Sequence, residues 1–163
     1  SKGNHITCTT CGRKVHYGED KRLKGVGFDF PFPFVSQWYD YQEDFVNGLD
    51  VTKMKEAPIF RDVANFSEVI LYKRKKLIFK NAQIALYGDR IAIDEGTARE
   101  CALLHEDTDV VTVLGRNKLN IYHGKKVYQL KGGKRFNALK YVHIYYRYRN
   151  IARGDTDGKF LGL

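Results

Sequence analysis

Two cysteines near the start of the chain, Cys8 and Cys11, are separated by two residues and followed by Gly12. This spacing is typical of a zinc knuckle, in which two thiolates converge on one metal ion and the glycine permits a tight turn. A structural zinc site needs four ligands, and the chain has no second Cys-x2-Cys pair. The sequence therefore predicts half of a zinc ribbon, with Cys8 and Cys11 as metal ligands and the other knuckle upstream of Ser1.

Two other interpretations of this segment stay open. His5 and His16 flank the cysteines and would complete a mononuclear His-x2-Cys-x2-Cys-x4-His site. Alternatively, the two thiols are free and bind no metal. Cys101, ninety residues after Cys11, is interpreted as a small buried hydrophobic residue.

No set of residues has the spacing of a known catalytic motif. The chain contains no Gly-x-Ser-x-Gly, no P-loop and no His-Glu-x2-His. His105 has carboxylates nearby but no nucleophile at a suitable spacing, and His143 lies on an apolar helical stripe. We therefore expect a binding module with no catalytic residues of its own.

Positive charge is concentrated in the last third of the chain. Residues 1–113 hold 16 Lys and Arg against 17 Asp and Glu, whereas residues 114–163 hold 12 against 2. Such asymmetry indicates either an anionic partner for the last third, namely phospholipid headgroups, nucleic acid or an acidic protein face, or a solvated basic surface.

The segment 131–135, "KGGKR", precedes a predicted helix, whose free N–H groups favour an anion. The sequence predicts anion or lipid-headgroup contacts by Lys131, Lys134 and Arg135 first, and by Arg116 and Lys118 second. The alternative is that Gly-Gly before a helix is only an ordinary turn. The run 72–76, "YKRKK", is interpreted as the solvated end of a strand or hairpin, with phosphate binding as the alternative.

Residues 24–42, "KGVGFDFPFPFVSQWYDYQ", are rich in aromatic residues. No Lys or Arg lies between Phe28 and Lys53, which argues against insertion into an anionic membrane. "KGVGFDF" departs from the RNA-binding signature it echoes at Val26 and Asp29, so nucleic-acid binding is the weakest alternative. We expect an extended docking arm whose contacts, with either this domain or a preceding one, are made by Phe30, Phe32, Phe34 and Trp38.

Hydrophobic periodicity indicates the elements that position these residues. Residues 36–49 have helical spacing, with Ser36 as the expected cap. About seven short β-branched and aromatic runs follow residue 60, and a helix with Phe136, Leu139, Val142, His143 and Tyr146 on one face ends before Gly154. This order predicts a mainly β fold with some helix: a small pleckstrin-homology (PH)-like barrel or sandwich of about seven antiparallel strands capped by a C-terminal helix.

Three parts are predicted: a half zinc-ribbon knuckle at 1–24, the aromatic and proline-containing arm with its helix at 25–60, and the PH-like domain at 61–163. The apolar runs are too short to span a bilayer, and the first residues lack a signal-peptide core. The Cys-x2-Cys pair suits a reducing compartment.

Several stretches together resemble one family, the region that follows the catalytic domain in bacterial lysophosphatidic acid (1-acyl-glycerol-3-phosphate) acyltransferase-like proteins. They are "CTTCGRKVHYGEDKRLKG", "FPFPFVSQWYDYQEDFVNGLD", "SEVILYKRKKLIFKNAQIALYGDRI", "VTVLGRNKLNIYHGKKVYQLKGGKRFNALKYVHIYYRYRNIARG" and the terminal "FLGL". The catalytic domain of that family carries a His-x4-Asp motif. No histidine of this chain has an aspartate five positions later, so no catalytic residue is transferred.

The resemblance implies a non-catalytic accessory domain of a membrane-associated bacterial acyltransferase of phospholipid biosynthesis. Its partners would be anionic phospholipid or the catalytic domain, at the inner face of the cell membrane, with zinc as the expected metal. The alternative is a protein-interaction or self-association module without a lipid role.

Overall fold

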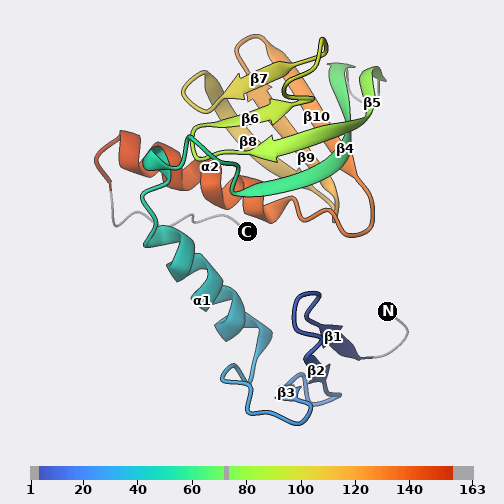
Figure 1. Ribbon diagram of the computed structural model, residues 1–163, viewed down its shortest axis with the longest axis vertical. Helices are drawn as coiled ribbons and strands as arrows, with labels where there is room; N and C mark the ends of the chain where they lie inside the picture. The colour runs from blue at the N-terminus through green and yellow to red at the C-terminus, as the bar shows by residue number, and fades with distance from the viewer. Residues whose placement is uncertain (1–3, 72–73, 156–163) are drawn as a thin grey trace. The chain divides into compact units, whose positions relative to one another are not determined.

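The strands expected after residue 60 form one curled antiparallel sheet. The computed structural model describes residues 4–71 and 74–155, so the terminal "FLGL" lies outside the described residues. The sheet contains β4 (Phe60–Leu71), β5 (Arg74–Leu86), β6 (Arg90–Ile93), β7 (Cys101–Leu104), β8 (Thr108–Leu114), β9 (Lys118–His123) and β10 (Lys126–Gly132), in the order β7-β6-β5-β4-β10-β9-β8. With the C-terminal helix α2 (Leu139–Ala152), this half-barrel confirms the predicted PH-like fold (Figure 1).

The described residues separate into two units, Ser1–Phe45 and Val46–Leu163. The first holds a three-stranded antiparallel sheet of β1 (His5–Thr7), β2 (Lys14–Tyr17) and β3 (Leu23–Gly25), which the sequence analysis did not predict. Helix α1 (Val35–Asn47) contains the boundary between the units, and a short 3-10 helix, η1 (Val51–Lys53), follows it. Because α1 begins at Val35, the prediction that Ser36 caps it was wrong.

The long strands β4 and β5 bend because their pairing is irregular. Their register shifts at three places, one of them between Ala64 and Phe66. At this bulge the Asn65 side chain accepts a hydrogen bond from the backbone N–H of Asn81, which has a positive φ of 52°. Bulges bend and twist strands, which allows the sheet to curl around a core.

The core of the second unit lies between the inner face of this sheet and α2. Its largest fully buried side chains are Phe66, Ile84, Leu86, Ile91, Ile93, His105, Leu119, Ile121, Leu130, Tyr141, Ile144 and Tyr145. The helix begins at Leu139 rather than at Phe136, and its buried face centres on Tyr141, Val142 and Tyr145. His143 and Tyr146 of the predicted stripe are only half-buried.

Candidate functional site

The five basic residues predicted to contact an anion lie together in space although they come from two separate stretches. Lys118 on β9 pairs directly with Lys131 on β10. The turn before β9 is held against the loop after β10, because the Asn117 side chain donates a hydrogen bond to the Gly132 carbonyl at 2.6 Å and the Gly132 N–H donates to the Asn117 carbonyl at 3.0 Å. We call this group the loop-end cluster: Arg116, Lys118, Lys131, Lys134 and Arg135.

The charge of the loop-end cluster is not neutralised within the part of the chain that the structure describes. None of its five side chains forms an ion pair there. Nearby Lys140, by contrast, is held 2.6 Å from Asp62. The cluster is therefore a region of uncompensated positive potential, as an anion-binding surface requires.

The helix after the loop contributes less to this surface than the sequence analysis expected. Because α2 begins at Leu139, four residues separate it from Lys134. The N–H of Leu139 donates to the Asn137 side chain at 3.0 Å, so it has an internal partner. Anion binding at the loop end would rest on the Lys and Arg side chains.

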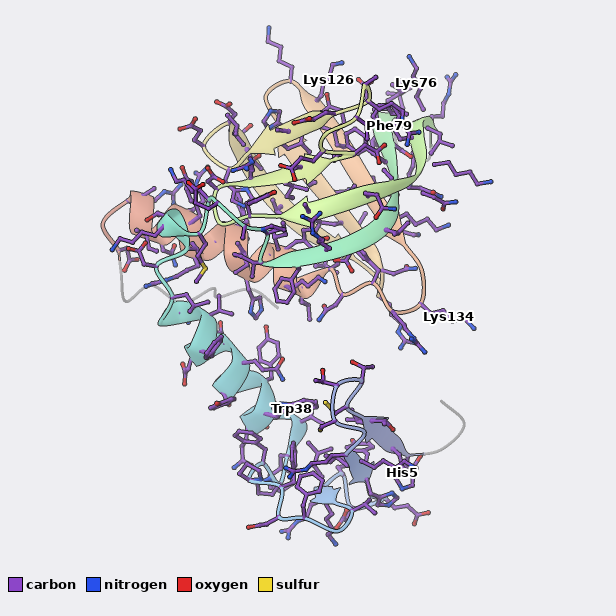
Figure 2. All side chains as sticks on the ribbon, viewed as in Figure 1. His5, Trp38, Lys76, Phe79, Lys126 and Lys134 are labelled. Carbon is purple, nitrogen blue, oxygen red and sulfur yellow. The ribbon has the colours of Figure 1, made fainter. Side chains whose placement is uncertain are left out.

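A second basic group lies at the opposite end of the same sheet. Glu68 on β4 pairs with Tyr128 on β10 and with Lys76 on β5, so the end of the β4–β5 hairpin lies next to the β9–β10 hairpin. Figure 2 shows Lys76 and Lys126 at this end and Lys134 at the other. We call this group the hairpin-end cluster: Arg74, Lys75, Lys76, Lys125 and Lys126.

Glu68 is the only carboxylate paired with this cluster among residues 4–71 and 74–155, at 3.5 Å from Lys126. Lys125 and Lys126 were not predicted to join the basic residues of the 72–76 run. Lys125 and Lys126 are about fifty residues from Arg74, Lys75 and Lys76 in the chain, and the pairing of β4 with both β5 and β10 brings the two groups together. The apolar residues on both sides of the 72–76 run are the feature of the sequence that could have indicated this surface.

Those apolar residues are exposed. Leu71 is 60% exposed, Leu77 53% and Ile70 52%, which makes them the three most exposed large hydrophobic side chains described in the second unit. A surface that combines basic and aliphatic side chains is typical of contact with a lipid interface.

In the first unit, Cys8 and Cys11 lie in the turn between β1 and β2. The Gly12 N–H donates to the Cys8 carbonyl at 3.0 Å, and Gly12 has a φ of +72°, which glycine adopts without strain. Backbone N–H groups of Cys11 and Thr10 donate to the Cys8 sulfur and lower the pKa of that thiol. A stabilised thiolate is what a metal ligand at Cys8 requires.

The described residues contain no group of three or more His, Cys, Asp and Glu side chains that could hold a metal ion. His5 and His16 instead pair across β1 and β2, with their rings 4.8 Å apart. The assignment of Cys8 and Cys11 to half of a zinc ribbon stays a prediction.

The two types of cysteine environment predict different reactivity. Burial raises the pKa of the Cys101 thiol, whereas that of Cys8 is lowered. Because the thiolate is the nucleophile, we expect iodoacetamide to alkylate Cys8 faster than Cys101 near neutral pH, and added Zn²⁺ to slow the reaction of Cys8 and Cys11 together. Peptide mass spectrometry over time measures each rate. In concentrated urea the rates should converge, and equal rates in the folded protein would contradict the prediction.

The aromatic arm folds back on its own unit. Phe30 packs edge-on against Trp38 of α1 at 5.7 Å and against Phe32 at 5.5 Å. The Leu23 N–H donates to the Pro33 carbonyl at 2.7 Å, which ties the arm to β3, and the Arg22 guanidinium lies over the Phe34 ring. A docking role for Phe30, Phe32, Phe34 and Trp38 toward another surface stays a prediction.

Among the described residues, no helix combines the length and apolar character needed to cross a membrane. No family model matches the chain, and no curated protein matches it. Among solved structures, the chain is similar to one described as "Vps36 N-terminal PH domain", with 18% sequence identity, coverage of 64% of this chain and 86% of that chain, and a TM-score of 0.48.

Proposed function

We propose that the second unit is a peripheral binding module for anionic phospholipid surfaces and that its hairpin end makes the principal contact. The observation that carries this proposal is the combination at one end of the sheet. Basic side chains, of which only Lys126 is paired with a carboxylate among the described residues, lie beside Ile70, Leu71 and Leu77, which are exposed to solvent. A PH-like module suits lipid or protein binding, and this surface composition favours lipid.

Two physical terms support such a contact. Each Lys or Arg near a negatively charged bilayer contributes about 1 kcal/mol. Apolar surface transferred from water contributes about 25 cal/mol per Å², so the aliphatic side chains add attraction that salt does not screen. Binding to an anionic polymer would be stabilised by the electrostatic contribution alone.

The wider role that we propose is accessory to a membrane-associated bacterial acyltransferase of phospholipid biosynthesis, at the inner face of the cell membrane. It is supported by the resemblance of the stretches given above and by the lack of a His-x4-Asp motif in the chain. The module would hold an enzyme near its lipid substrate, and no residue of the chain is given a catalytic role.

Co-sedimentation with vesicles tests the proposal. We expect the protein to bind vesicles of phosphatidylcholine mixed with phosphatidate and not vesicles of phosphatidylcholine alone. Changing Arg74→Glu, Lys76→Glu and Lys125→Glu together should weaken binding at least about tenfold, because three attractive charges become repulsive. The double change Ile70→Ser/Leu77→Ser should weaken binding without altering net charge.

The matched control replaces three exposed lysines of the first unit, Lys14→Glu, Lys21→Glu and Lys24→Glu, and changes the net charge equally. It should bind as the unchanged protein does. Equal loss of binding in the control and the hairpin-end variant would contradict the proposal. With lysophosphatidate and an acyl donor added to the same vesicles, this chain should transfer no acyl group.

A further inference from the structure

The two basic clusters lie at opposite ends of the half-barrel. Strand β10 begins at Lys126, in the hairpin-end cluster, and ends at Gly132, beside the loop-end cluster. With a rise of about 3.3 Å per residue, these two ends of the strand are about 20 Å apart. The screening length at physiological ionic strength is about 8 Å, so each cluster attracts anions independently of the other.

The loop end, like the hairpin end, combines basic side chains with an exposed aliphatic side chain. Leu114 on β8 pairs directly with Lys118 on β9 and is 45% exposed. An exposed aliphatic side chain therefore lies beside uncompensated positive charge at this end too. The loops that carry the charges are tied to each other by the Asn117 hydrogen bonds, so the cluster is a formed surface of the folded domain.

From this arrangement we propose that the loop end is a second binding surface for anionic phospholipid and that the half-barrel bridges two bilayers, one at each end. This inference rests on the proposed function for the hairpin end. A flat bilayer that contacts the end of the β4–β5 hairpin leaves the loop end facing away from that bilayer. The basic side chains of the loop end then have no anionic partner. Leu114 is less exposed than Ile70, Leu71 and Leu77 at the hairpin end, so we expect the loop end to bind more weakly.

The test compares binding with vesicle clustering. The loop-end variant carries Lys131→Glu, Lys134→Glu and Arg135→Glu, and the hairpin-end variant carries the three changes given above. Both lower the net charge of +9 by six, so they differ only in where the charge is reversed. Circular dichroism and thermal unfolding establish that both variants fold, and sedimentation velocity establishes that the unchanged protein is monomeric.

We expect the unchanged protein to sediment with phosphatidate-containing vesicles and to cluster them, seen as a rise in light scattering that high salt reverses. The loop-end variant should still sediment, the hairpin-end variant should sediment at least about tenfold more weakly, and neither should cluster vesicles. The variant that combines all six changes should lose sedimentation too, and this result would show that the two ends account for binding.

Different failures have different meanings. If the unchanged protein does not sediment, the proposed function and the bridging inference both fail. If it sediments without clustering, or if clustering persists in the loop-end variant, only bridging is overturned. Clustering by a protein that self-associates would also overturn it, and so would single-stranded RNA retention that disappears in the loop-end variant without any vesicle clustering.

Discussion

Replacing Gly88 by alanine is expected to lower the free energy of unfolding of the second unit by about 3 kcal/mol. Gly88 lies in the turn between β5 and β6, where its N–H donates to the Met54 carbonyl at 2.8 Å. A Cβ added there would lie 1.8 Å from the carbonyl oxygen of Val51, a residue with no solvent exposure. The obstructing atoms are backbone atoms, so a side-chain rotation cannot relieve the overlap.

Chemical denaturation of the two proteins measures this difference. Gly133→Ala is the matched control, because nothing lies within 4 Å of its added Cβ. We expect the control to change the free energy of unfolding by less than about 0.5 kcal/mol. Equal stability of the Gly88→Ala variant and the unchanged protein would mean that η1 does not approach this turn so closely.

The buried His105 is expected to make the domain unstable in acid. The residue is 1% exposed between β7 and β8, with its ring against Tyr145 and Tyr148 of α2, and neither ring nitrogen forms a hydrogen bond of good geometry. Burial lowers the pKa of His105 from 6.5 to about 4, and the charge of Asp89 and the Tyr87 backbone oppose this effect only in part.

Above pH 6.5 this histidine is neutral in both the folded and the unfolded chain, and its contribution to stability does not vary. As the pH falls from 6.5 toward 4, the unfolded chain binds a proton that the folded chain does not, so stability is lost. The loss from this residue reaches about 3 kcal/mol near pH 4.

Unfolding measured at several pH values in the unchanged protein and in His105→Leu tests this expectation. Leucine removes the titrating group together with its two buried ring nitrogens, which lack a hydrogen-bond partner of good geometry. The variant should lose less stability between pH 6.5 and 4, by about 3 kcal/mol, while other titrating groups contribute equally to both proteins. Parallel pH profiles would show that His105 is already protonated, or hydrated, in the folded domain.

Local patterns were sufficient to predict much of the fold. In residues 119–130, "LNIYHGKKVYQL", two apolar runs flank His123 and Gly124, which is typical of a hairpin, and the structure pairs His123 with Lys126 around Gly124, whose φ is +56°. Short-range periodicity and turn residues determine such elements, because their contacts are close in sequence. The end of α2 before Gly154 was predicted for the same reason.

The small sheet of the first unit was missed because its strands are only three or four residues long and carry no clear alternation. Boundaries of α1 and α2 were displaced by a few residues because competing local hydrogen bonds decide where a helix begins. Gln37 accepts from the Phe34 N–H, and Asn137 accepts from the Leu139 N–H.

Residue type and order by themselves determined that this chain has a mainly β domain closed by a helix, a pair of thiols with metal-ligand spacing and an excess of positive charge in its last third. Tertiary structure alone decided that the charge forms two separate clusters. Whether charges act together depends on distances within about one screening length. Those distances are set by the β9–β10 hairpin and by the pairing of β10 with β4, which joins residues far apart in the chain.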